Sequence, residues 1–361
     1  MIPLTIPLID DDDVSAVESV LRSGNLVQGR QVAQFEDAVA SVVGVPHAVA
    51  VSSGTAALHL AMLALGVGSG DAVAVPTYSW PATANVVEAV GARCVFIDIE
   101  ESTWAMSPRA LAAVTEPLTA VVPVHPFGAM ADLAALAAAA PGVPVVEDAA
   151  CALGSTRDGR SAGSVGVLGC FSFHPRKAIT TGEGGMVTTA SGELADALRA
   201  WRNLGIDATS TPPDFVLPGL NYRLTDMQGA LGVTQMAKLE RAIDGRRAGA
   251  ARYDELLAGT EIQPPSQVPR SQPVFQSYVV VLPEGVDRGR LIAGTAAAGV
   301  QTQIGTIAIP FTEYYRRTYA VDPGAYPVTA RLADRALSLP LYPGIDLDDQ
   351  RRVVDVVRGC L

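Results

Sequence analysis

The sequence predicts an α/β protein with a mostly parallel central sheet, helices on both faces of that sheet, and a smaller second domain. The first observation is alternation, because short runs rich in β-branched residues are followed by helix-like stretches. The second is that these runs are apolar throughout, as strands buried on both faces of a parallel sheet are. The third is the length of 361 residues, which suits one large and one smaller domain.

The elements can be placed in order along the chain. Helices are expected at 55–66, 81–91 and 131–140, and strands at 48–51, 71–76, 92–99, 119–128 and 143–150. A polar, proline-rich stretch at 263–273 precedes a further strand-like run, PVFQSYVVVLP. We therefore expect a large domain over residues 1–262 and a small C-terminal α+β domain over residues 263–361.

Composition and charge exclude several classes of protein. The net charge is −11 and no basic block exists, which argues against a nucleic-acid partner. The four cysteines and four histidines are scattered, so we expect no disulfide framework and no metal site, in keeping with a reducing cytoplasm. The start MIPLTIPLIDDDD lacks the features of a signal peptide, and the alanine-rich runs are too interrupted to span a membrane.

Hydroxyl groups and a glycine follow the first expected strand, where Ser53, Gly54 and Thr55 open a helix directly. Ligands of parallel sheets bind at the carboxyl ends of the strands. Free backbone N–H groups at a helix start favour a phosphate at such a position. Serine and threonine are also common N-caps in the absence of any ligand, so both interpretations stay open at this point.

Three further groups follow later strands. Glu147 and Asp148 end the expected strand at 143–150, where a buried carboxylate needs either a cationic ligand or an arginine partner. Trp80, after the second strand, either belongs to the core or stacks on an aromatic ring. Lys177 stands between the run FSF and the glycine-rich GEGG, and alone it would be read as a surface lysine at a strand end.

Together these groups describe a site for pyridoxal phosphate. The helix start would bind the phosphate, Trp80 would stack on the ring, and Asp148 would keep the ring nitrogen protonated so that the ring accepts electrons. Lys177, which lies 29 residues after Asp148 and five after Ser172, would bind the aldehyde as a Schiff base.

Five stretches resemble the DegT/DnrJ/EryC1/StrS family, the sugar aminotransferases of the aspartate aminotransferase fold (fold type I of the pyridoxal phosphate enzymes). They are SSGTAALH, PTYSWPATAN, VEDAACALG, FSFHPRKAITTGEGG and LNYRLTDMQGALGVTQMAKLE. The resemblance is dense over about residues 1–240 and continues more loosely in SYVV, RLADRALSLPLYPG and DQRRVVDVV. The lysine block with GEGG and the NYRLTD block are the specific ones.

The resemblance implies a role for each matching residue. Lys177 would form the Schiff base and act as the general base, and Asp148 would pair with the pyridine nitrogen. Asn221 or Arg223 would reach the phosphate bound by the neighbouring subunit, which would make the protein an obligate homodimer with shared active sites. For this NYR block, a plain helix start is the alternative. The further residues that would contact the cofactor are Gly54, Thr55, Ala56, Trp80, Cys151 and Ser172.

The implied reaction is a transamination in two halves, with pyridoxamine phosphate as the intermediate form of the cofactor. An amino acid, L-glutamate in most of the family, would give its amino group. A nucleotide-linked keto-deoxysugar of secondary-metabolite (including antibiotic) or surface-glycan biosynthesis would take it. The alternatives are a cyclitol ketone as acceptor and a catalytically silent regulatory or binding protein that retains the fold, against which the intact Lys177 and Asp148 argue.

Two departures from the family pattern bear on this site. Cys151 stands where the family often has a glutamine that supports the phenolic oxygen of the cofactor. The segment QIGTIAIP at 303–310 replaces the family's IHYP in a region that shapes the sugar pocket. The first departure concerns one contact of the cofactor, its phenolic oxygen, and the second concerns the sugar pocket. Together they bear on substrate handling more than on cofactor binding.

Overall fold

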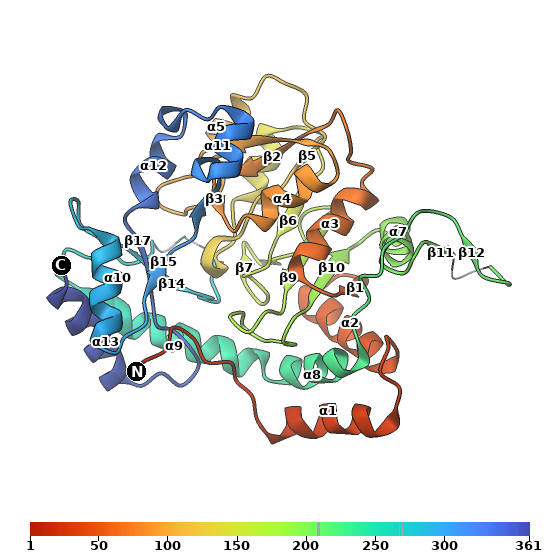
Figure 1. Cartoon of the computed structure of the whole chain (residues 1–361), viewed down its shortest axis with the longest axis horizontal. Helices are drawn as coiled ribbons and strands as arrows, with labels where there is room; N and C mark the ends of the chain where they lie inside the picture. The colour runs from red at the N-terminus through yellow and green to blue at the C-terminus, as the bar shows by residue number, and fades with distance from the viewer. Residues whose placement is uncertain (208–209, 267, 269) are drawn as a thin grey trace.

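The computed structural model describes residues 1–207, 210–266, 268 and 270–361. A central sheet with helices around it forms the larger part of the molecule, and a smaller sheet lies on the C-terminal side, close to the N-terminus (Figure 1). This is the α/β architecture expected from the sequence.

The strands of the central sheet follow the order β4-β2-β5-β6-β9-β10-β1. Parallel bridges from Val121 to Val145 and from Val124 to Asp148 join its two hydrogen-bonded groups. The pairs formed by β10 with β9 and β1 are antiparallel, and the others are parallel, as predicted. The strands are β1 (His47–Val51), β2 (Ala72–Pro76), β4 (Arg93–Ile97), β5 (Ala120–Val121), β6 (Val146–Asp148), β9 (Leu168–Ser172) and β10 (Gly185–Thr189).

Alternate residues of these strands pack into two separate cores, because successive side chains of a strand point to opposite faces. In β1, Ala48 and Ala50 belong to one core, and Val49 and Val51 belong to the other. The first core is covered by α2 (Arg30–Val43), α5 (Pro108–Ala112), α6 (Leu133–Ala139) and α8 (Asp226–Ala237), with α1 (Asp11–Ser23) packed outside α8. The second is covered by α3 (Gly54–Ala64), α4 (Ala82–Ala89) and α7 (Gly192–Arg202).

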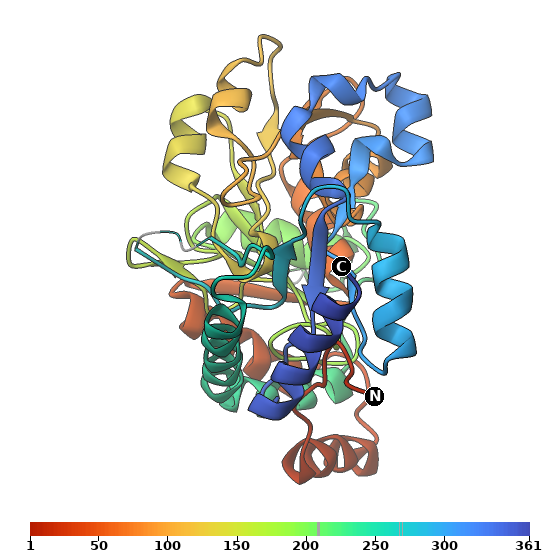
Figure 2. The same cartoon turned by 90° about the vertical axis from the view of Figure 1, so that its left-hand side faces the viewer.

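The C-terminal sheet is antiparallel, with the order β14-β17-β15. Its strands are β14 (Tyr278–Val281), β15 (Gln303–Ile304) and β17 (Ala336–Leu339), and α10 (Arg288–Ala297) and α13 (Leu347–Gly359) pack beside it (Figure 2). Ile2 and the second half of α9 (Leu239–Leu257) also belong to its core. The boundary between residues 262 and 263 stays a prediction.

One C-terminal segment returns to the large sheet. β16 (Ile307–Ala308) pairs with β3 (Tyr78–Ser79), and α11 (Glu313–Tyr319) packs beyond it. The hydroxyl groups of Tyr314 and Tyr319 both donate to Glu88 of α4. These contacts fix the segment before α11 against the carboxyl end of β2.

Two segments differ from the sequence-based expectation. The strand expected at 119–128 is regular only over β5 and continues as an isolated bridge at Val124, because Pro123 and Pro126 have no N–H to donate. The amphipathic stretch after the NYR block forms two helices, α8 and α9, that meet at Lys238. The first difference shortens a predicted strand, and neither changes the order of the elements.

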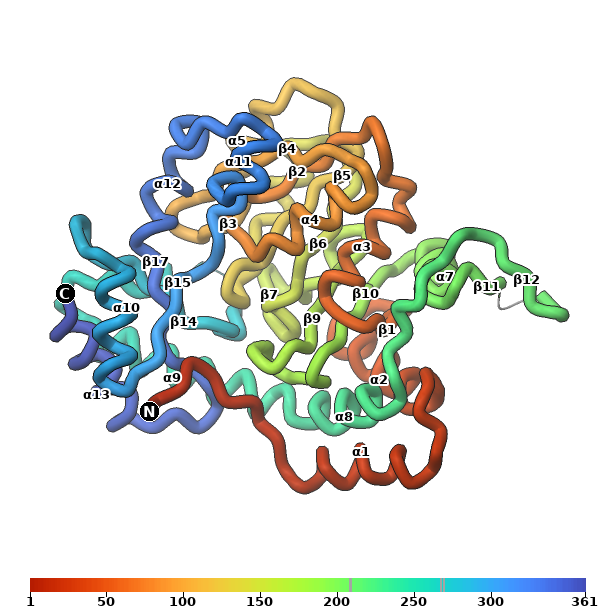
Figure 3. The backbone as a smooth tube through the Cα atoms, in the orientation of Figure 1, coloured from red at the N-terminus to blue at the C-terminus, as the bar shows by residue number. Residues whose placement is uncertain are grey.

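The remaining elements are short. The hairpin of β11 (Ile206–Asp207) and β12 (Asp214–Phe215) extends away from the body of the molecule (Figure 3). The others are β7 (Thr156–Arg157), β8 (Arg160–Ser161), β13 (Ser271–Gln272), α12 (Pro327–Ala333) and the 3₁₀ turns η1 (Pro126–Gly128), η2 (Ile309–Phe311) and η3 (Pro323–Ala325). Within the described ranges, no helix combines the length and apolar content needed to cross a membrane.

Candidate active site

A cavity of about 340 Å³ opens where β1, β2, β6 and β9 end. Its walls come from the starts of α3 and α4, from the loop after β9, and from the C-terminal segment around β15 and β16. The predicted site residues that line it are Gly54, Thr55, Trp80, Asp148, Cys151, Ser172 and Lys177. The structure therefore brings most of the predicted residues together.

The start of α3 forms one end of the cavity. The Ser53 hydroxyl accepts a hydrogen bond from the N–H of Ala56 at 3.1 Å, so Ser53 is the N-cap. A Cβ atom at Gly54 would lie 2.7 Å from the Cβ of Ser172, so only glycine allows the helix start to approach β9 this closely. The first-turn N–H groups of Gly54 and Thr55 have no partner inside the helix, and the open side of the turn faces the cavity.

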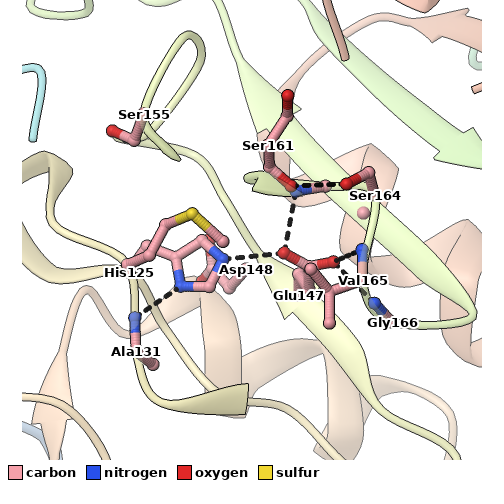
Figure 4. Close-up of polar contacts among 12 residues, drawn as sticks. His125, Ala131, Glu147, Asp148, Ser155, Ser161, Ser164, Val165 and Gly166 are labelled. Atoms are coloured by element: carbon pink, nitrogen blue, oxygen red, sulfur yellow. Dashed lines mark hydrogen bonds and ion pairs between the residues drawn. The ribbon is translucent and has the colours of Figure 1, made fainter. Parts of the chain in front are cut away.

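Glu147 is fully buried and fully hydrogen-bonded (Figure 4). Its carboxylate accepts from His125 Nε2 at 2.8 Å and from the backbone N–H groups of Gly163, Val165 and Gly166 at 2.7 Å each. Burial alone would raise the pKa of Glu147, but these hydrogen bonds outweigh it, so its pKa is lowered and it stays ionised. All of its bonds are internal to the fold.

Asp148, the next residue, points to the opposite face of β6 and lines the cavity. It is 5% exposed, and its two oxygens accept from the Thr83 hydroxyl at 2.7 Å and the Ala150 N–H at 3.2 Å. Among the described residues, no arginine lies within ion-pair distance of Asp148, so the arginine-partner alternative does not hold. This carboxylate retains acceptor capacity toward the cavity.

Lys177 ends a tight turn after β9, in which its N–H donates to the His174 carbonyl at 2.8 Å. The Nζ atom lines the cavity and lies 3.1 Å from Cys151 Sγ. The sequence has two lysines, and the other one, Lys238, forms ion pairs with Asp10 and Asp13. Lys177 is therefore a cavity amine with a single soft contact, which is unlike an ordinary surface lysine.

The wall opposite Lys177 contains aromatic and C-terminal residues. Trp80 lines the cavity and is 65% exposed, so its indole face is available to a ligand. Gln303, Ile304, Gly305 and Thr306 line the same wall, so the divergent segment at 303–310 does contribute to the pocket. The Tyr78 hydroxyl accepts from the Thr306 N–H at 3.2 Å, and burial raises the pKa of Tyr78 to about 12, which keeps the phenol neutral.

Three predicted residues do not line this cavity. Ala56 lies buried one residue inside α3, where its N–H is bound to Ser53. Asn221 forms a bridge with Asn203, and Arg223 donates to the Asn203 side chain at 2.7 Å. The carbonyl of Tyr222, between them, accepts from the Ser52 N–H at 2.9 Å, so this segment lies behind the start of α3.

Sequence reasoning assigned no role to two residues that shape the site. Thr83 donates to Asp148. The sequence feature that could have indicated this residue is its place in the PATAN block after Trp80. His125 accepts from the Ala131 N–H at 3.2 Å and donates to Glu147, so both ring nitrogens are used. Its signal was a histidine at the end of an apolar strand, which is too common to be diagnostic.

A family model of the DegT/DnrJ/EryC1/StrS aminotransferase family matches residues 7–358. The chain belongs to this family. That membership confirms the family and type I fold predicted from the sequence, and it makes the protein a pyridoxal phosphate-dependent aminotransferase.

Solved structures share the whole fold. A Streptococcus pneumoniae protein assigned as a sugar aminotransferase, in its PMP form, is 27% identical, with a TM-score of 0.94 over 99% of this chain and 97% of that one. TlmJ, an aminotransferase from Streptoalloteichus hindustanus, is 32% identical, with a TM-score of 0.92 over 99% and 98%. DesV from S. venezuelae, solved in complex with a ketimine intermediate, is 33% identical, with a TM-score of 0.91 over 99% and 98%.

The cavity residues fit the cofactor of this family. An amine stands at one side, a buried carboxylate with spare acceptor capacity lies at the base, and a helix start with hydroxyl groups closes one end. An exposed tryptophan provides the flat face. The cavity therefore offers a partner for the aldehyde, the ring nitrogen, the phosphate and the ring face of pyridoxal phosphate.

Proposed function

We propose that this protein moves an amino group from L-glutamate to the ketone of a nucleotide-linked deoxysugar, with Lys177 as the residue that carries the cofactor and the proton. The observation that supports this most is the placement of the Lys177 amine in the same cavity as the Asp148 carboxylate. The likeness to solved aminotransferases, one of them assigned to sugars, supports the acceptor class.

Several residues of the cavity have separate roles in this proposal. The Thr55 hydroxyl, the first-turn N–H groups of α3 and Ser172 bind the phosphate, and Trp80 stacks on the ring. Asp148, oriented by Thr83, stabilises a proton on the ring nitrogen. The bound cofactor supplies an aldehyde for covalent attachment and a cationic ring that withdraws electrons from the reacting carbon.

With the cofactor bound, Lys177 would be the general base, and its Nζ atom would take up and return the proton of the substrate carbon. Among the described residues that line the cavity, Lys177 is the only primary amine, which is the group that a Schiff base requires. Cys151 stands at the position of the family's glutamine, and its Sγ atom contacts the Nζ atom of Lys177 at 3.1 Å. Cys151 is thus part of our proposed cofactor site.

We also propose that the enzyme is a homodimer whose sites are shared. Asn221 and Arg223 lie behind α3, outside the cavity of their own chain, which is where residues that reach a second subunit's phosphate would be expected. The exposed Phe215 and Val216 of the projecting hairpin provide apolar surface for such an interface. The reaction is placed in the cytoplasm, where the four free cysteines would stay reduced.

The experiment is a visible absorption spectrum of the purified protein before and after L-glutamate, followed by a panel of nucleotide-linked keto sugars and cyclitol ketones. We expect a visible band of the lysine-bound cofactor that bleaches with glutamate and returns with a keto sugar. Lys177→Ala should lose this cycle, whereas Lys238→Arg, which keeps the ion pairs, should retain it. A return of the band only with cyclitol ketones would overturn the sugar assignment.

A further inference from the structure

Arg246 of α9 is a fully buried guanidinium that the proposed reaction does not use. It is 1% exposed and lies within the apolar stripe of α9, between Ile243 and Ala250. Burial of an arginine at such a position removes its hydration, which is strongly unfavourable unless other groups offset the loss. The position therefore requires an explanation beyond packing.

The partners of Arg246 are backbone carbonyls. Its Nη1 atom donates to the carbonyls of Gln276 at 2.9 Å and Leu341 at 3.2 Å, and its Nη2 atom donates to the carbonyl of Lys177 at 3.2 Å. Its Nε atom has no hydrogen-bond partner among the described residues. Across the described residues, no carboxylate lies within ion-pair distance of it. Burial lowers the pKa of Arg246 to about 10, so the group is still a cation at neutral pH.

The three carbonyls come from separate parts of the chain. One belongs to the turn that carries Lys177, one to the cavity wall before β14, and one to the segment after β17. The Gln276 side chain adds a second bond to the turn that carries Lys177, because its Nε2 atom donates to the carbonyl of Arg176 at 2.9 Å. Arg246 and Gln276 thus bind two consecutive carbonyls of this turn, those of Lys177 and Arg176.

The helix is shaped to bring these segments together. A Cβ atom at Gly249 would lie 2.7 Å from a side-chain carbon of Leu341, and one at Gly245 would lie 3.1 Å from Pro343. Glycines one residue before and three residues after Arg246 therefore let the segment 341–343 approach α9 closely. Tyr253 adds a bond from its hydroxyl to the Pro340 carbonyl at 2.8 Å.

We propose that Arg246 is a positioning residue for transamination, which fixes the main chain of Lys177 relative to the cavity wall at Gln276. The inference rests on the proposed role of Lys177. A shorter or neutral side chain cannot bridge three carbonyls at once, whereas the planar fork of arginine can. Without it, the turn loses one of its two anchors and the amine samples positions away from the cofactor.

The test uses the small number of amines in the chain. The full-length apoprotein is mixed with pyridoxal phosphate, trapped with borohydride at intervals, and digested, and mass spectrometry follows the labelling of Lys177 and Lys238 separately. We expect Arg246→Gln to slow labelling of Lys177 by about 10-fold to 100-fold, the scale expected when a reacting group is misplaced. Labelling of Lys238 should not change. When the Arg246→Gln variant is reloaded with pyridoxal phosphate, kcat should fall and the KM for glutamate should stay at the wild-type value.

Arg247→Gln is the matched control. Arg247 also donates to backbone carbonyls, those of Pro273 and Gln272, but it makes no bond to the lysine turn. In the Arg247→Gln variant, Lys177 should be labelled at the wild-type rate. Arg246→Lys should fall between wild type and Arg246→Gln, because it retains the charge and fewer of the bonds.

The outcomes separate the two proposals. Equal labelling of Lys177 in wild type and in a folded Arg246→Gln variant overturns the role of Arg246, and so does an equal loss in Arg247→Gln. If Arg246→Gln has no cooperative unfolding transition, Arg246→Lys decides, and wild-type labelling in that variant overturns the proposal. If wild-type Lys177 is labelled no faster than Lys238, the role of Lys177 itself is wrong, whatever the arginine does.

Discussion

Glu147 and Asp148 are adjacent carboxylates in one strand, and their surroundings are opposite. Glu147 has four donors, all from the fold, and no acceptor capacity left for a ligand. Asp148 has two donors and faces the cavity. The two lysines differ in the same way, because Lys238 lies between two aspartates while Lys177 has one contact with a thiol.

This difference separates structural groups from chemical ones. A buried ionised group whose hydrogen bonds are all satisfied by the fold stabilises the fold and has nothing to offer a substrate. A buried or half-buried ionisable group with unused capacity costs free energy of folding, and such groups are common at functional sites, where a ligand completes their hydrogen bonds. Variants of these residues should therefore separate the rate of the reaction from the stability of the fold, with the largest effect at Asp148.

Asp148→Asn should lower the rate of the glutamate half-reaction by about 10²-fold to 10³-fold, the scale for loss of one electrostatic group at a reacting centre. The new amide can accept from the Ala150 N–H and donate to the Thr83 hydroxyl oxygen, whose own proton can go to the Trp80 carbonyl, so the free energy of unfolding should change little. Stopped-flow absorbance of the bound cofactor measures the rate, and urea unfolding measures the stability. A variant with a near-normal rate would contradict the assignment of Asp148 to the ring nitrogen.

Glu147→Gln should show the reverse pattern, with a loss of about 3 kcal/mol in the free energy of unfolding and a smaller change in rate per folded molecule. The new amide group would point a donor at one of the N–H groups that now bind the carboxylate. Urea unfolding at neutral pH, with Asp148→Asn as the matched comparison, measures it. Similar stability for both variants would mean that hydrogen-bond saturation does not separate the two residues.

The same pair predicts a pH dependence. The folded-state pKa of Glu147 is below its ordinary value of 4.5, so its contribution to stability is complete above that pH and is lost as the pH falls through the folded-state pKa. The difference in stability between wild type and Glu147→Gln should therefore narrow at acidic pH. Urea titrations between neutral and acidic pH would reveal it, and a constant difference would contradict the argument.

Much of the fold and part of the site follow from local sequence. The β-branched runs and the helix starts at Ser53 and Thr225 are set by neighbouring residues, so they were predictable. The contacts of Arg246, Thr83 and His125 were not, because each depends on which distant carbonyl or carboxylate the fold brings near. The trace of Arg246 in the sequence is a cation within an apolar helical stripe, and that pattern does not say which carbonyls it meets.

Thr83→Val sharpens the contrast by removing one of the two donors to Asp148 while keeping the shape of the side chain. We expect a loss of about 1–2 kcal/mol in transition-state stabilisation, or roughly tenfold in kcat/KM, because Asp148 loses its orientation and not its charge. Thr83→Ser keeps the hydroxyl and should remain near wild type. A loss in Thr83→Ser with none in Thr83→Val would attribute the effect to packing of the methyl group.

Cys151→Ala should have the smallest effect, less than about fivefold in kcat/KM, because sulfur is a weak hydrogen-bond partner and one modest bond is worth about 1 kcal/mol. The contact at 3.1 Å then only restrains the Lys177 amine. Steady-state kinetics with glutamate and the preferred keto sugar measure the change. A loss of 100-fold or more would show that the thiol takes part in proton transfer, and Cys151 would then join Asp148 among the groups whose unused capacity serves the chemistry.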